Sequence, residues 1–169
     1  MTQLSTRHYS LEAFLRDLSS EDRLPGSGAA GAIALALAAA CAAKAAAVSL
    51  KHAPENEELQ QARAKLLAHV DAAIEGSDED MERFARFLRL RSEAAARSVV
   101  VADLKLLGLI DELTGSLARL DDQVRRSVSG DLVAARALAQ AARAIQVENI
   151  EELNGRPQKN PADLTKGGA

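Results

Sequence analysis

Four features of this 169-residue chain combine residue types and spacings that could support chemistry. They are a Pro-Gly-Ser-Gly turn at 25–28, the Lys51-His52 pair, Asp80, and Asp131 with Asn149. A carboxylate can transfer protons, and an amide or a lysine can orient a polar ligand. Each feature also has a purely structural explanation.

The turn at 25–28 places flexible backbone directly before an alanine-rich stretch that we expect to be helical. Free N–H groups and the helix dipole favour an anion at such a place, for example a phosphate or a carboxylate. The turn lacks the spacing of a nucleotide-binding glycine motif, and no strand precedes it. The alternative is a plain turn that leads into a helix.

The charged candidates have simple alternatives in helix capping. Lys51 and His52 end the alanine-rich stretch, where the dipole favours positive charge, although either could also line a cleft as a base or a cation. Asp80 follows Ser77 by three residues, which is the spacing of a capping pair at a helix start. Asp131 falls in the first turn of the last expected helix, a favourable place for any carboxylate.

Asn149 is more informative because it follows Asp131 by five helical turns. Both side chains therefore project from one face of the last expected helix, about 27 Å apart. One monomer cannot easily use both at a single site, but a dimer could bring them to related clefts. Two unrelated polar residues are the alternative.

Metal and serine-nucleophile chemistry are poorly supported. His8 and His69 have no ligand partners at metal spacing, and the sequence contains neither an HExxH nor a Gly-x-Ser-x-Gly motif, so we expect no metal site. Cys41 is the single cysteine, which excludes an intrachain disulfide and favours a reducing compartment. Residues 1–10 lack the apolar core of a signal peptide. We therefore expect a cytoplasmic protein.

Charge and aromatic content argue against a nucleic-acid partner. The formal net charge is -3 and the isoelectric point is near 5.7, whereas general nucleic-acid binders carry basic surfaces. Only four aromatic side chains are present, and they are scattered along the chain, which offers no platform for stacking bases.

The elements that must position these residues all have helical periodicity, which predicts an all-α protein. A first helix is expected after Ser10 as its N-cap, with a buried stripe of Leu11, Phe14, Leu15 and Leu18. The next stretch, 28–50, contains 13 alanines in 23 residues. A membrane span is the alternative there, but alanine, glycine and a lysine make the stretch only weakly hydrophobic. A buried central helix with closely packed neighbours, or with a symmetric dimer partner, fits better.

The later segments also have helical patterns. We expect a helix over 55–74, a break at the GSDED sequence of 76–80, and a helical pattern from 77 to 128 with kinks or short breaks at Gly108 and Gly115. A last helix is expected over 131–153, followed by a disordered tail at 154–169. Together these segments predict a single domain at 1–153, an up-and-down antiparallel helical bundle around a long alanine-rich helix.

Three motifs in chain order resemble the cyclodeaminase/cyclohydrolase family of folate enzymes. The family has a Pro-Gly-Gly-Gly-Ser turn before an alanine-rich helix, then a Glu-Asp-Ala-x-x-Phe element, and then a late helix with Asp near its start and Asn near its end. The resemblance covers most of residues 9–153. The matching positions are Pro25, Gly26, Gly28, Ala32, Ala36 and Ala40, then Glu79, Asp80 and Phe84, and finally Asp131 and Asn149.

The resemblance implies a homodimeric helical protein that takes a tetrahydrofolate derivative as substrate, with no metal or redox cofactor and no membrane partner. The implied reaction is cyclodeamination of a formimino group, or hydrolytic opening of a methenyl bridge. Asp80 would be the general acid/base. The implied substrate-binding residues are Gly26, Ser27, Gly28, Lys51, Asp131 and Asn149, with Lys51 against the carboxylate tail and Asp131 and Asn149 orienting the pteridine or the water.

The chain departs from the family pattern at several positions. The sequence has Ser27, Ala29 and Ala47 where the family has glycine, serine and asparagine, and Leu90-Arg91-Ser92 where it has Leu-Pro-Lys; Met81 replaces an alanine. A noncatalytic folate-binding or assembly module is therefore the alternative to an enzyme. A third possibility is a purely structural bundle without folate affinity.

Overall fold

The computed structural model describes residues 5–22 and 24–155, and every regular element within these ranges is helical. The predicted all-α class is therefore confirmed for this part of the chain. The elements in order are η1 (Thr6–His8), α1 (Leu11–Leu18), α2 (Ser27–Leu50), α3 (Glu57–Leu90), α4 (Glu93–Leu120), η2 (Arg126–Val128) and α5 (Ser129–Gly155).

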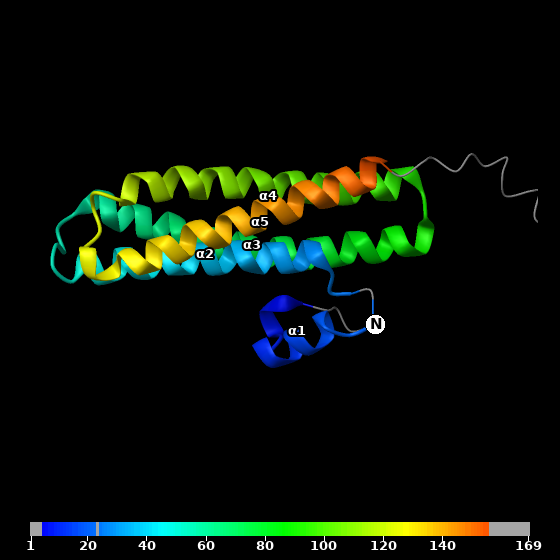
Figure 1. The fold of residues 1–169 in the computed structure, drawn as a ribbon, viewed down its shortest axis with the longest axis horizontal. Coiled ribbons are helices and arrows are strands. Elements are labelled where there is room, and N and C mark those ends of the chain that lie inside the picture. Colours follow the sequence, from blue (N-terminus) through cyan, green and yellow to red (C-terminus); the bar gives the residue numbers. More distant parts are fainter. Residues whose placement is uncertain (1–4, 23, 156–169) are drawn as a thin grey trace, which may run out of the picture.

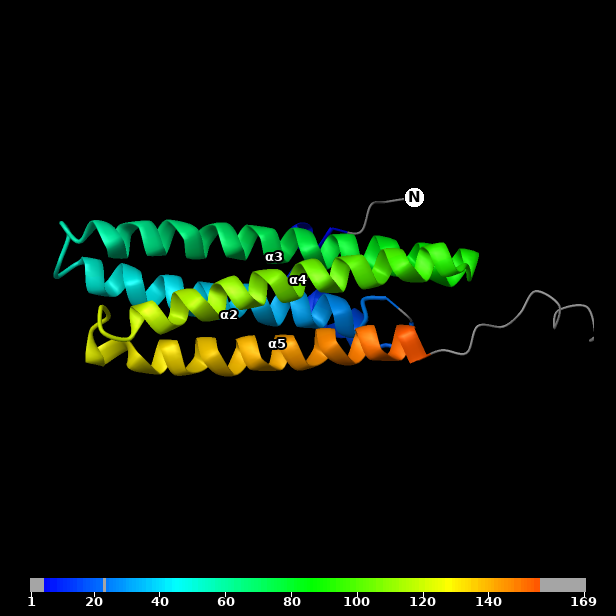
Figure 2. The same cartoon turned by 90° about the horizontal axis from the view of Figure 1, so that it is seen from above.

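Four long helices form the body of the molecule. The helices α2, α3, α4 and α5 lie side by side along one axis, and the chain reverses direction between each helix and the next (Figures 1 and 2). α2 packs along both α3 and α5, and α4 completes the bundle against the same two helices. The starts of α2 and α4 therefore lie at the same end of the bundle as the ends of α3 and α5.

The alanine-rich helix α2 is a core element. Thirteen of its 24 residues are buried, mostly alanines whose small side chains let α3 and α5 approach closely. Among the described helices, α2 alone is long and apolar enough to cross a membrane, and half of its most apolar window is buried inside the protein. This burial fits the predicted central helix of a bundle.

The predicted break at 76–80 is wrong, because α3 runs without interruption through the GSDED sequence. Gly76 allows close packing there: a Cβ at this position would lie 2.6 Å from the Cδ2 atom of Leu106. Ser77 and Asp80 lie inside the helix, so they do not form the capping pair that was the alternative for Asp80. Asp78 instead accepts hydrogen bonds from the side chain of Ser5, at 2.8 Å, and from the backbone N–H of Thr6.

The break between helices comes later, at Arg91 and Ser92, where the sequence pattern indicated continuous helix. Arg91 adopts a left-handed conformation with φ of 49°, and its N–H bonds the Phe87 carbonyl at 2.8 Å. The Ser92 side chain then caps α4 by accepting the N–H of Ala95 at 3.3 Å. Gly108 lies within the single helix α4, as does Gly115, so neither ends it.

The first and last helices differ in detail from expectation. Ser10 caps α1 as predicted, accepting the Ala13 N–H at 3.1 Å. The predicted buried stripe is wrong in part, because only Phe14 is buried while Leu11 is 69% and Leu15 is 52% exposed. α5 extends to Gly155, so the predicted tail from 154 begins within this helix and otherwise lies outside the described residues.

Candidate active site

A pocket of about 130 Å³ lies toward the end of the bundle where α2 begins, and all four long helices contribute to it. Five of the seven site residues that the sequence suggested line this one pocket. Its lining residues are Gly26, Ser27 and Gly28 at the start of α2, Asp80 and Phe84 on α3, Val99 and Asp103 on α4, and Asn149, Glu152 and Leu153 on α5.

Asp80 contacts the N-terminus of α2 directly. The N-cap of α2 is Gly26, which has no side chain to bond the free N–H groups, and the Asp80 carboxylate accepts the N–H of Ala29 instead. A Cβ at Gly28 would lie 2.4 Å from Oδ1 of Asp80. The carboxylate can therefore reach this helix end only because residue 28 is glycine.

Burial makes Asp80 a weak acid. Its side chain is 5% exposed, and loss of hydration raises its pKa to about 6, although the N–H of Ala29 opposes this by stabilising the charged form. A carboxyl group with a pKa near neutral pH can both accept and donate a proton under ordinary conditions. These are the properties required of a general acid/base.

Asp103 is a second buried carboxyl group in the same pocket, and sequence reasoning missed it. It is fully buried on α4, and neither of its side-chain oxygens has a hydrogen-bond partner. Burial, together with the negative charge of Asp80, raises its pKa to about 7. The available signal was its register: Asp103 shares a helix face with the core residues Val99, Leu106 and Ile110.

The end of α5 holds the start of α2 through two polar contacts. Ser27 donates a hydrogen bond from its hydroxyl to Oδ1 of Asn149 at 2.8 Å. Gln146, which is fully buried, donates from Nε2 to the Gly28 carbonyl at 3.2 Å. A Cβ at Gly31 would lie 2.6 Å from the same Nε2 atom, so this glycine also permits the close approach.

The pocket has an apolar wall beside this polar floor. Phe84, Val99 and Leu153 come from three different helices, and each lines the pocket. Next to the pocket, Phe14 of α1 packs with Ala29 and Met81 in a small separate core cluster. The short helix α1 thus supports the same turn of α2 that contacts Asp80.

Lys51 and Asp131 are placed elsewhere in the chain. Lys51 is the C-cap of α2, about 35 Å along the helix from Gly28, and Asp131 binds Lys44 at 3.2 Å near that far end. Neither lines the pocket that contains Asp80. Their role in substrate binding stays a prediction, and it requires a second copy of the chain.

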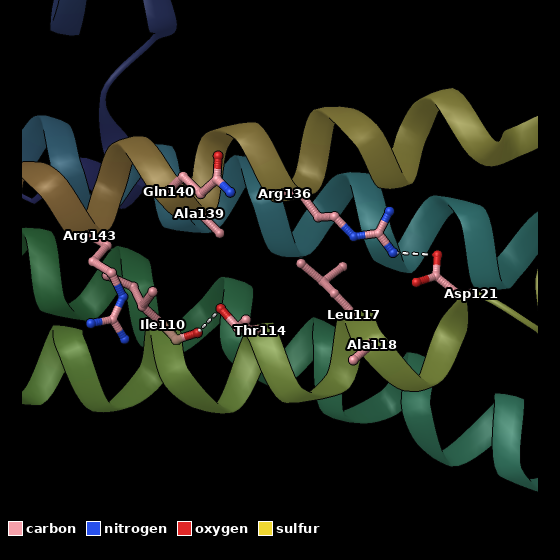
Figure 3. Close-up of a pocket in the computed structure, with 9 residues that line it drawn as sticks. All are labelled: Ile110, Thr114, Leu117, Ala118, Asp121, Arg136, Ala139, Gln140 and Arg143. Carbon is pink, nitrogen blue, oxygen red and sulfur yellow. Dashed lines mark hydrogen bonds and ion pairs between the residues drawn. The ribbon is translucent and has the colours of Figure 1, made fainter.

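A larger groove of about 270 Å³ lies between α4 and α5 (Figure 3). Arg136 forms an ion pair with Asp121 across it, and the hydroxyl of Thr114 is occupied by the Ile110 carbonyl at 2.8 Å. Arg143, which also lines the groove, pairs with Asp111. Because its charges are already paired, this groove is a weaker candidate for chemistry than the smaller pocket.

Comparisons with known proteins identify the family and the fold of the chain. The family model described as Formiminotransferase-cyclodeaminase matches residues 10–154. Among solved structures, the chain is similar to formiminotetrahydrofolate cyclodeaminase from Thermotoga maritima, with 20% identity and a TM-score of 0.72. That similarity covers 90% of this chain and 82% of the other, and at this identity it shows a shared fold. No curated protein sequence matches the chain.

Replacing Gly28 with alanine tests the contact between Asp80 and α2. The new Cβ would overlap the carboxylate, so we expect Gly28→Ala to lower the free energy of unfolding by about 1–3 kcal/mol. Urea denaturation measures this. Gly108→Ala is the matched control, because a Cβ there meets nothing within 4 Å and should stabilise the helix by about 0.5–1 kcal/mol. Equal effects of the two variants would contradict the proposed close approach.

The two buried carboxyl groups should make stability depend on pH. Their pKa values are higher in the folded state than in the unfolded state, so their contribution is fully present below about pH 4 and is lost as pH rises to about 6 for Asp80 and about 7 for Asp103. Each group should lower the free energy of unfolding by about 1.4 kcal/mol per pH unit within its window.

Denaturant titrations of the unsubstituted protein and of Asp103→Asn from pH 4 to 8 check this. The free energy of unfolding of the variant should fall less steeply with pH, so its stability relative to the unsubstituted protein should increase toward pH 8. Asp122→Asn is the control, since Asp122 is exposed in the loop after α4. If the curve for Asp103→Asn ran parallel to that of the control, the assignment of Asp103 would be wrong.

Proposed function

This chain belongs to the formiminotransferase-cyclodeaminase family, and from that premise we propose that it is an enzyme acting on a formimino derivative of tetrahydrofolate. The observation that carries the proposal is Asp80, a buried carboxyl group with a pKa of about 6 in a pocket where all four long helices meet. The name of the similar Thermotoga maritima protein supports cyclodeamination as the reaction.

Cyclodeamination needs one proton to move between two nitrogens. A folate nitrogen attacks the formimino carbon, which forms a tetrahedral centre; the bond from this carbon to the terminal nitrogen then breaks, and ammonia leaves. The attacking nitrogen gives up its proton, and the departing nitrogen gains one, so no net proton is released from the protonated substrate. Asp80 can accept the first proton and donate it to the second nitrogen.

Two departures from the family pattern, Ser27 and Ala29, are compatible with this role of Asp80. Ala29 contacts Asp80 through its backbone N–H, which does not depend on the serine side chain of the family. Ser27, which replaces a glycine, bonds Asn149 and so ties the turn to α5. We assign to the turn and Asn149, which line the pocket, the orientation of the pteridine or of a water molecule. These contacts favour an enzyme over the noncatalytic module.

A homodimer would complete the site with Lys51 and Asp131. The stripe of α2 that α3 and α5 leave uncovered includes Leu37, 50% exposed near the middle of the helix, and the small residues Ala40 and Cys41. Two copies packed antiparallel about Leu37 would bring Lys51 of the second copy toward the turn at 25–28. Such an arrangement is typical of a two-fold interface, in which one patch serves both subunits. We propose a cytoplasmic location, which the free thiol of Cys41 supports.

Asp80→Asn tests the reaction. The amide cannot transfer a proton, so we expect turnover of formiminotetrahydrofolate to fall by roughly 10²–10⁴-fold while the protein remains folded. Near-ultraviolet absorbance follows the methenyl product, and the same signal, decreasing from added methenyltetrahydrofolate, measures cyclohydrolase activity. Asp122→Asn should turn over substrate at the unsubstituted rate. Full activity of Asp80→Asn would remove Asp80 from the mechanism, and stabilisation by folate without any turnover would identify a binding module.

Leu37→Glu tests the dimer. Sedimentation should show two copies in the unsubstituted protein and a shift to one copy in the variant, because the carboxylate would be placed at the centre of the interface. Leu67→Glu is the matched control on α3, where Leu67 is 44% exposed and away from the stripe. A monomer before substitution would refute this part of the proposal.

A further inference from the structure

Every titratable residue that lines the pocket at the start of α2 is acidic. Its titratable lining groups are Asp80 from α3, Asp103 from α4 and Glu152 from α5, whereas α2 contributes none. None of its lining residues is lysine, arginine or histidine. Lys105 and Arg83, which lie on the two helices bearing the aspartates, are bound to Glu79 instead. The carboxylates of Asp80 and Asp103 therefore favour a positively charged guest in the pocket.

Asp103 points more specifically to a guest that donates hydrogen bonds. Its two carboxylate oxygens are buried and have no hydrogen-bond partner. The carboxylate of Asp80, the other buried aspartate of the pocket, accepts a hydrogen bond from the N–H of Ala29. An ionised carboxylate left without a partner is costly, and two coplanar N–H groups are the geometry that satisfies both oxygens at once. A metal ion fits less well, since no group of three or more metal-binding side chains occurs among the described residues.

The pocket has room for a small nitrogen cation. Its volume of about 130 Å³ is well above the ~10–15 Å³ that one water molecule needs on the same measure. An ammonium or amidinium ion therefore fits within it.

We propose that Asp103 makes this pocket a binding site for a small nitrogen cation of the amidinium or ammonium class, held by its N–H groups. This inference deepens the proposed function and rests on it where the substrate is concerned. A protonated formimino group is an amidinium, whereas a methenyl bridge is a cation without N–H on the reacting atoms. Asp103 would thus select formimino over methenyl folates and receive the departing ammonia.

The binding test uses formamidinium chloride as the probe and needs no folate. For a dissociation constant on the order of 10 mM, 100 mM formamidinium should raise the Tm of the full chain by roughly 3–6 °C at pH 8. Tetramethylammonium chloride at equal ionic strength, a cation without N–H, should give no comparable rise. Affinity for formamidinium should fall at least tenfold at pH 5, because Asp80 and Asp103 become protonated while the probe stays charged.

Asp103→Asn should abolish the rise with formamidinium, whereas Asp122→Asn should keep it. If Asp103→Asn does not fold, Asp103→Ser removes the same carboxylate. Equal shifts in the Asp103 variant and the control, or no shift in the unsubstituted protein, would overturn the proposal.

A kinetic measurement separates this inference from the proposed function. Asp103→Asn should raise the KM for formiminotetrahydrofolate at least tenfold and leave that for methenyltetrahydrofolate nearly unchanged. If formamidinium binds and Asp103 is required, but the protein does not turn over folate, the proposed function is wrong and the cation site is supported. If the protein turns over formiminotetrahydrofolate but Asp103→Asn binds formamidinium unchanged, the proposed function is supported and the cation site is wrong.

Discussion

The bond between the Asp80 carboxylate and the N-terminus of α2 is the constraint on which the site depends. It joins the middle of a 34-residue helix to the start of a 24-residue one, and it supplies the cap that Gly26 cannot. The same bond fixes the position of the carboxylate at one wall of the pocket. Stability and the proposed chemistry therefore share one interaction, and the absence of a side chain at Gly28 makes it possible.

Small residues have the same role throughout the bundle core. Glycine or alanine on α2 lets α3 and α5 come close enough for their polar side chains to reach the α2 backbone, as Gln146 reaches the carbonyl of Gly28. Bulky residues would hold the helices further apart and break these hydrogen bonds to the α2 backbone. The low aromatic content is thus a condition of the architecture, because the core is built for close approach of backbones.

Local sequence signals predicted the parts of this structure that depend on local physics. The all-α class, the extent of α2 and the cap at Ser10 follow from periodicity, alanine content and a capping residue. Five of the predicted site residues line one pocket, and the family motifs had pointed to all five. The proximity of Asp103 to Asp80 in one pocket was not predicted, since it depends on how α4 lies against α3. The GSDED sequence misled for the same reason: Gly76 faces Leu106 across the bundle, so tertiary packing overrides a local break signal.

The hydrogen bonds of η1 bear on the order in which segments of the protein dock as it folds. Ser5 and Thr6 find their partners on Ser77 and Asp78, 71 to 73 positions further along the chain. During synthesis Ser5 and Thr6 leave the ribosome well before Ser77 and Asp78, so their docking surface does not exist until much of α3 has emerged. Ser5 and Thr6 therefore wait for α3, and they settle one helical turn from Asp80.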